Sequence, residues 1–162
     1  ELILENAAGQ TTMWAGASES GNGQLTVQSK DGGDLIYAGA EVSGNGLLRV
    51  SSKNGEDLIH AGVDRLGQGL LTIGSRDGAG LIHAGIDSLG HGQLAVRSKD
   101  GVVVVHAAVD GSGNGRLRVG SKDGGDLIYA GSDLSGNGQL KANSRDGVVL
   151  ILGKIDGFGD EE

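Results

Sequence analysis

Apolar and polar residues alternate along short segments of this chain, and the alternation recurs every 23 residues. In the segment 24–29, Leu25 and Val27 are apolar and the residues between and after them are polar. Alternation with a period of two predicts a β-strand that buries one face. The leucine of this strand recurs in every repeat, at Leu2, Leu25, Leu48, Leu71, Leu94, Leu117 and Leu140.

A second apolar segment follows in each repeat, as in residues 35–40. Because side chains alternate across a strand, Ile36, Ala38 and Ala40 are predicted to face one way and Leu35 and Tyr37 the other. A strand that is apolar on both faces needs cover on both faces. This second strand therefore differs from the half-buried first strand.

Two turn signals separate the strands and fix the repeat length. One is a basic residue followed by Asp or Asn and then Gly, as in Lys30-Asp31-Gly32. The other is a Gly-x-Gly triplet, which begins at Gly21, Gly44, Gly67, Gly90, Gly113 and Gly136. The constant interval defines seven units that start at residues 1, 24, 47, 70, 93, 116 and 139. We expect one repeat domain over residues 1–162, with atypical first and last units as caps.

These patterns predict an all-β, elongated tandem-repeat fold, a β-solenoid or β-prism with two strands per 23-residue repeat. In a solenoid, equivalent strands of successive repeats stack in parallel about 4.8 Å apart. In a hairpin meander each repeat adds two antiparallel strands, and in an intertwined homotrimer three chains share one prism. The two-faced second strand argues against a bare single-layer meander, and the choice between solenoid and trimer stays open.

Composition and charge exclude several other classes. The chain has 33 glycines among 162 residues and no proline, and glycine at this density disfavours helix. The formal net charge of −8 predicts repulsion from nucleic acid and from anionic membranes. The absence of cysteine removes disulfides and thiolate chemistry. No apolar run is long enough to predict a membrane-spanning helix.

Units of the form Gly-Asn-Gly-x-Leu-x-Val, followed by Lys-Asp-Gly and Leu-Ile-x-Ala-Gly, recur along the whole chain. They resemble the tandem Gly-rich repeats of some bacterial surface and secreted proteins. The resemblance implies a trimeric β-stalk and an extracellular or cell-surface location. It assigns no functional residue to this chain.

One column of residues carries candidate chemistry, the third position of the second strand. It is occupied by Trp14, Tyr37, His60, His83, His106, Tyr129 and Leu152. Histidine is the commonest metal ligand, so His60, His83 and His106 are the candidates for a metal site. The alternative is a structural ladder of flat rings, which we favour because Tyr, Trp and Leu share the column and no acidic residue flanks it. We therefore expect no metal and no cofactor.

Other polar positions have simpler interpretations. Asp31 and Asp34, like Asp123 and Asp126, could offer oxygen ligands to calcium, but the nine-residue repeat of calcium-binding solenoids is absent. Basic neighbours predict surface charge pairing instead. The recurrent serines Ser29, Ser52, Ser75, Ser98, Ser121 and Ser144 are predicted to cap the strand with their hydroxyls, and His91 to be a solvent-facing turn residue.

The sequence offers no nucleophile, acid–base pair or phosphate loop, so we predict that the protein is not an enzyme. The main hypothesis is a non-enzymatic structural spacer, stalk or fibre module that self-associates, with a homotrimer as one form. The alternative is a carbohydrate- or surface-binding adhesin module that uses one repetitive face. An adhesin should break the repeat pattern with clustered aromatic residues.

Overall fold

The computed structural model describes residues 1–41, 43–133 and 135–144, and the backbone alone of residues 149–154. The chain divides into two compact units, Glu1–Gly85 and Ile86–Glu162. The boundary falls at the end of a strand and not between two predicted repeats. Each unit is therefore described by itself, and the prediction of a single repeat domain stays a prediction.

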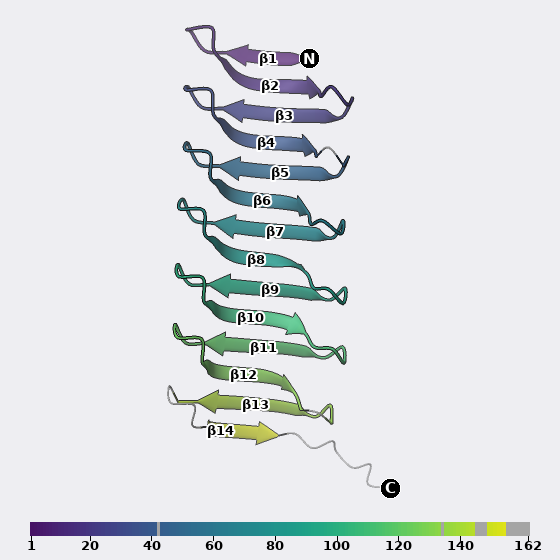
Figure 1. Ribbon diagram of the computed structural model, residues 1–162, viewed down its shortest axis with the longest axis vertical. Helices are drawn as coiled ribbons and strands as arrows, with labels where there is room; N and C mark the ends of the chain where they lie inside the picture. Colours follow the sequence, from purple (N-terminus) through teal and green to yellow (C-terminus); the bar gives the residue numbers. More distant parts are fainter. Residues whose placement is uncertain (42, 134, 145–148, 155–162) are drawn as a thin grey trace. The chain divides into compact units, whose positions relative to one another are not determined.

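The first unit is a run of antiparallel strands in chain order (Figure 1). Its strands are β1 (Leu2–Glu5), β2 (Thr11–Ala17), β3 (Gly23–Gln28), β4 (Asp34–Ala40), β5 (Gly46–Ser51), β6 (Asp57–Val63), β7 (Gly69–Gly74) and β8 (Gly80–Ile86). Each strand pairs with the strand that precedes it and the one that follows, from β1–β2 to β7–β8.

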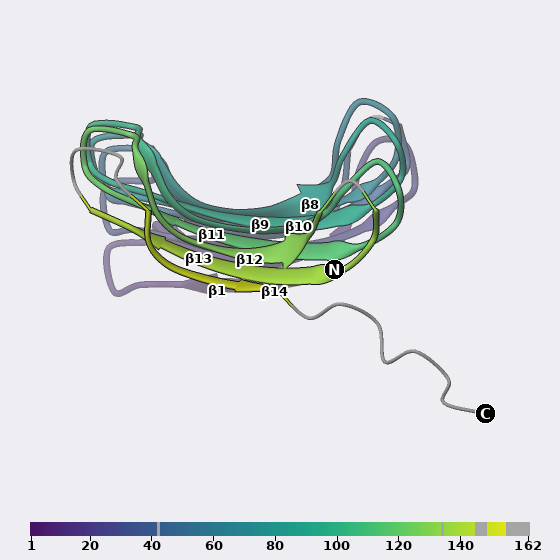
Figure 2. The same ribbon diagram turned by 90° about the horizontal axis from the view of Figure 1, so that it is seen from below.

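The second unit has the same organisation. Its strands are β9 (Gly92–Arg97), β10 (Val103–Val109), β11 (Gly115–Gly120), β12 (Asp126–Ser132), β13 (Gly138–Asn143) and β14 (Val149–Lys154). They pair antiparallel in sequence order. Seen along the sheet, these strands bow, and the turns at their two ends curl toward the same side (Figure 2).

The predicted all-β tandem repeat with two strands per 23 residues is confirmed. The solenoid alternative, in which equivalent strands stack in parallel, is wrong. Every described pair of neighbouring strands within a unit is antiparallel. Five-residue turns allow consecutive strands to pair as hairpins, and each strand here pairs with its neighbour in sequence. A solenoid would instead pair alternate strands, such as β3 and β5, across residues 29–45. The meander that the two-faced second strand argued against is therefore the observed arrangement.

Both turn sequences adopt one hydrogen-bonding pattern. In residues 64–68, the Asp64 N–H donates to the Gln68 carbonyl at 2.8 Å, and the Gly67 N–H donates to the Asp64 carbonyl at 3.0 Å. The same two bonds occur in residues 75–79 and in the other described turns. The fourth turn residue has a positive φ, 79° at Gly67, which favours glycine and explains the fixed glycine period.

The first residue of each turn uses its side chain to hold the loop. Asp64 Oδ1 accepts the backbone N–H groups of Leu66 at 2.8 Å and Gln68 at 3.0 Å. In the other kind of turn Ser29 Oγ accepts the N–H of Gly33 at 3.1 Å. Short side chains with an acceptor oxygen favour this local bonding. The predicted capping role of the serine column is thus borne out at the serines that bond in this way, Ser29, Ser52, Ser75, Ser98 and Ser121.

A β-bulge interrupts the pairing at the start of the second strand of each repeat. Between β3 and β4, Val27 pairs with Ile36 but Gln28 pairs with Asp34, so the register skips Leu35. The bulge brings Asp34 onto the same face as Gln28, whose Nε2 donates to Asp34 Oδ1 at 3.0 Å. The prediction that Ile36, Ala38 and Ala40 face one way and Tyr37 the other is consistent with the pairing, in which Ile36 and Ala38 lie opposite Val50 and Leu48.

The pairing sorts the side chains of each unit into two unlike faces. One, the apolar face, carries Leu, Val, Ile, Met and Ala at the central positions of the strands, because leucine mostly pairs with alanine and the other apolar residues pair with one another. In the first unit it comprises Leu2, Leu4, Met13, Ala15, Leu25, Val27, Ile36, Ala38, Leu48, Val50, Ile59, Ala61, Leu71, Ile73, Ile82 and Ala84. In the second unit it comprises Leu94, Val96, Val105, Ala107, Leu117, Val119, Ile128, Ala130, Leu140 and Ala142.

The opposite face, the ring face, bears the aromatic and imidazole side chains together with charged and polar residues. Arg49 lies between Tyr37 and His60 on neighbouring strands. The expectation that the second strand is apolar on both faces is therefore corrected: a polar residue of the first strand flanks each ring on at least one side, as Thr26 flanks Trp14 and Arg118 flanks His106. Over the part of the chain that the structure describes, Ala95 is the one buried apolar residue, at 5% exposure. Within that part, no helix is long and apolar enough to cross a membrane.

Candidate functional site

The ring column occupies equivalent positions on alternate strands. In the first unit it consists of Trp14 on β2, Tyr37 on β4, His60 on β6 and His83 on β8, and in the second unit of His106 on β10 and Tyr129 on β12. The side chain of Leu152, the last predicted member, lies outside the described residues. Because a strand of the other kind intervenes, successive rings are two strand spacings apart, about 9.6 Å. The spacing of about 4.8 Å expected from a solenoid is thus doubled.

Each ring leans along its strand over the residue two positions later, which is glycine in most repeats. A Cβ added to Gly131 would lie 2.6 Å from Tyr129 Oη, and one added to Gly16 would lie 2.8 Å from Trp14 Cζ2. The ring therefore takes the space that a side chain would fill, and it covers backbone that glycine leaves bare. In the fifth repeat the ring is the smaller imidazole of His106, and the residue two positions later is Ala108 instead of glycine.

The tyrosines are fixed further by their hydroxyl groups and by cations. Tyr129 Oη donates to the Ser132 carbonyl at 3.2 Å, and the Lys141 amine lies 5.9 Å from the Tyr129 ring centroid. In the first unit, the Arg49 guanidinium lies 5.6 Å from the Tyr37 ring centroid. Cations at this distance from a ring face are attracted to it.

The histidine candidates for a metal site have no acidic neighbour in the ladder. His60 pairs with Arg49 on one side and Thr72 on the other, and His83 shares Thr72. Over residues 1–41, 43–133 and 135–144, no group of three or more His, Cys, Asp or Glu side chains could hold a metal ion. Each imidazole has a cation or a hydroxyl beside it in the ladder, and the preference for a structural role over a metal site stays a prediction.

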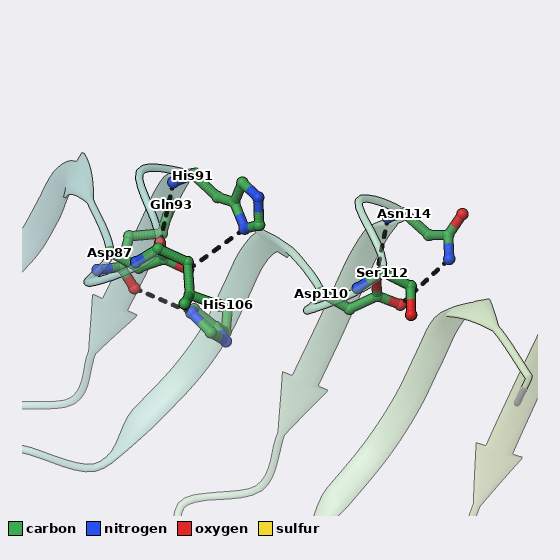
Figure 3. Close-up of polar contacts among 8 residues, drawn as sticks. Asp87, His91, Gln93, His106, Asp110, Ser112 and Asn114 are labelled. Carbon is green, nitrogen blue, oxygen red and sulfur yellow. Dashed lines mark hydrogen bonds and ion pairs between the residues drawn. The ribbon is translucent and has the colours of Figure 1, made fainter.

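His106 has the most constrained environment of the three histidines. It pairs with Ala95 and Arg118, and its Nε2 lies 3.5 Å from Gln93 Oε1 (Figure 3). Burial, together with the positive charges of Arg116 and Arg118, lowers the pKa of His106 below its usual 6.5. The imidazole is therefore neutral at pH 7.

Acidic residues at the turns are structural acceptors. The Asn114 backbone N–H donates to Asp110 Oδ1 at 2.9 Å and is the largest cause of the lowered pKa of Asp110 (Figure 3). Asp87 receives the same bond from the His91 N–H, which lowers its pKa. The His91 side chain is only 31% exposed, and its Nδ1 lies 3.8 Å from Asp87 Oδ2, so it is not the solvent-facing turn residue that we predicted.

The aspartates considered as calcium ligands are engaged by neighbouring side chains. Lys30 pairs with Asp31 at 2.7 Å, and Lys122 pairs with Asp123 at 2.8 Å. Arg118 Nε donates to Asp126 Oδ1 at 2.9 Å across the ladder. The predicted charge pairing is confirmed for these residues.

An open depression of about 810 Å³ lies on the ring face of the second unit. Its floor includes Tyr129 and Lys141, and Asp110, Asp126 and Asn143 border it. Several of these polar groups already bond within the unit. Ser132 Oγ donates to Asp110 Oδ2 at 3.1 Å, and Asn143 Nδ2 donates to the Asp126 carbonyl at 3.0 Å. The depression contains one ring and no aromatic cluster.

The apolar face extends over more strands than the depression does. The alternation in the sequence predicted which residues share this face, but it did not predict that they form an exposed surface. Its leucines are half-exposed, 43% at Leu48 and 40% at Leu117, and Ile128 is 41% exposed. No protein-family model matches this chain, and no curated protein matches it. The two unlike faces and their repetition along the chain are therefore the features from which a function can be inferred.

Proposed function

We propose that this chain is a non-enzymatic structural spacer, stalk or fibre module built from repeated β-hairpins. The observation that carries the proposal is the uniformity of the repeats. The same two backbone bonds close the turns at Asp64, Asp87, Asp110 and Asp133, and the same register joins the strands between them. A protein that sets length needs identical units, whereas a binding or catalytic site needs one unit that differs.

The arrangement of the rings supports a spacer over an adhesin. Tyr37 and His60 are separated by Arg49, and His60 and His83 are separated by Thr72, so the rings form no continuous aromatic platform. The resemblance to bacterial surface and secreted repeats supports placement at the cell surface or outside the cell.

Removal of one repeat tests the spacer role. Deletion of residues 47–69 joins Gly46 to Leu70 in the original phase. We expect unchanged strand content by circular dichroism and a maximum dimension, from small-angle X-ray scattering, that is shorter by about 9.6 Å, which is two strand spacings. The matched control replaces residues 47–69 with a copy of residues 24–46 and should leave the dimension unchanged.

Two results would contradict the proposal. One is loss of strand structure on deletion of the repeat, because equivalent units should be dispensable. The other is specific binding of the full chain to a glycan array that the replacement control abolishes, because that would assign function to one repeat and favour the adhesin.

A further inference from the structure

The apolar face lacks cover within each described unit. Each unit forms a single layer of hairpins, so residues such as Leu48 and Leu117 contact their ladder neighbours but no second layer. A sheet that is apolar on one face needs a partner layer to bury it. Exposed apolar patches of this kind mark interaction surfaces.

The accessible surface is larger than that of a compact globular monomer of the same mass. The chain exposes 10618 Å² at a mass of 16.3 kDa. A compact monomer of that mass exposes about 7,500 Å². The difference is roughly 3,000 Å² per chain, whereas obligate interfaces bury about 2,000–5,000 Å² for both partners together, or about 1,000–2,500 Å² per chain. One partner layer on one face therefore accounts for part of this excess.

The chemistry of the two faces decides which one needs the partner. The ring face holds the charged residues of the strands, and they are partly satisfied there, as in the Arg49–Asp57 and Arg118–Asp126 pairs. Among the strand residues whose side chains the structure describes, those of the apolar face carry no charge. A nucleic acid, a charged peptide or an anionic lipid headgroup has nothing to bind on that face.

We propose that the apolar face packs against the apolar face of a second copy of this chain. The inference rests on the proposed structural function and names its partner. Along one column of the second unit, large and small residues alternate strand by strand, in the order Leu94, Ala107, Leu117, Ala130 and Leu140. Leucines of one copy can fill the spaces over alanines of the other, as in two sheets packed about 10 Å apart.

The repeat period selects a second copy over an unrelated partner. The leucines of the column recur every two strands, about 9.6 Å apart. A partner must present apolar groups at the same interval over many strands to fill the column. A second copy does so by construction, because its own column has the same period.

Cysteine substitution at neighbouring positions tests this packing, since the chain has no native cysteine. Leu71 lies on the apolar face between Ala61 and Ala84 and is 37% exposed, whereas Thr72 lies on the ring face between His60 and His83. We expect light scattering to give a whole multiple of 16.3 kDa, two or more chains. We also expect a bulky maleimide to label Leu71→Cys at least about 10-fold more slowly than Thr72→Cys, because only the first thiol is covered.

Three results would overturn the inference. A single-chain mass with intact strand content refutes the packing but leaves the spacer proposal standing if the repeat deletion still shortens the particle. An oligomer in which Leu71→Cys reacts as fast as Thr72→Cys associates through another surface. A folded monomer that binds uncharged phosphatidylcholine vesicles would assign the apolar face to lipid.

Discussion

The ring that leans over a glycine in each repeat leads to a specific prediction at Gly131. This residue lies within β12 and does not have a positive φ, so alanine can adopt its backbone conformation. The added Cβ, however, would lie 2.6 Å from Oη and 2.9 Å from Cζ of Tyr129. The ring must therefore turn away, which breaks its 3.2 Å hydrogen bond to the Ser132 carbonyl.

The expected cost follows from the groups that move. Loss of the hydroxyl bond costs about 1 kcal/mol. A side chain forced from its preferred rotamer costs a further 0.5–1.5 kcal/mol, roughly. Alanine recovers about 0.5–1 kcal/mol relative to glycine in a strand, because the unfolded chain loses freedom. We predict that Gly131→Ala destabilises the fold by about 1 kcal/mol.

Urea unfolding measures the effect, with all variants compared at one chain concentration. The double variant Tyr129→His/Gly131→Ala recreates the His106 and Ala108 pair of the fifth repeat, and we expect it to regain most of the loss. Gly62→Ala is the matched control, because its Cβ would lie 3.3 Å from Leu47 Cδ1 and 3.5 Å from His60 Nε2. Equal destabilisation by Gly131→Ala and Gly62→Ala, or no coupling between positions 129 and 131, would refute the reasoning.

Further predictions concern the turns and the titrating groups. Asp64→Ala should lower stability by about 1 kcal/mol, because it removes the acceptor of two backbone N–H groups, whereas Asp64→Asn should retain most of it in urea unfolding. Asp87 and Asp110 have pKa values lowered by backbone N–H donors, so their stabilisation is complete above the ordinary pKa of 3.8 and is lost as the pH falls through the lowered values. Asp110→Asn should therefore reduce the loss of stability in acid, as measured by unfolding midpoints across a pH series. For His106, whose pKa is lowered by burial first and by nearby cations, stability should fall as the pH drops below 6.5, because protonation favours the unfolded chain. Replacing one of those cations, in Arg118→Gln, should raise the His106 pKa measured by NMR titration, and an unchanged value would show that Arg118 does not contribute to the lowered pKa.

The strands and turns of this chain were predictable because each depends on neighbouring residues. Alternation around Leu25 and Val27 predicts a strand that the structure places at Gly23–Gln28. The glycine period predicts turns whose fourth residue needs a positive φ, as at Gly67. These features are encoded within a few residues, and they are confirmed.

The pairing of the strands and the character of the second face were predicted less well. Alternation alone treats Leu35 and Tyr37 as one face, but the bulge at Leu35 resets the register and brings Asp34 beside Gln28. Parallel and antiparallel stacking give the same periodicity in sequence. The turn lengths fit both, because residues 29–45 are long enough to connect β3 to β5 in parallel, so the sequence pattern left the choice open.

The relation between each ring and its glycine was also present in the sequence as a joint pattern. Tyr37 precedes Gly39 and Tyr129 precedes Gly131, whereas His106 precedes Ala108. The contact that links these positions depends on how far a ring leans along its strand, which composition and period do not reveal. A pattern of large rings followed two residues later by glycine is the signal that could have indicated it.

The order of the strands has a consequence for how the chain acquires its structure. Every described strand partner is close in sequence, and even Gln139 and Lys154, at the outer end of a hairpin, are 15 positions apart. Loops this short close at little entropic cost, and folding rates rise as contacts become more local. Each hairpin can form as soon as it leaves the ribosome, before the next one is made. The early hairpins then expose their leucines while synthesis continues, so the chain presents its apolar face to solvent before all of its hairpins are made.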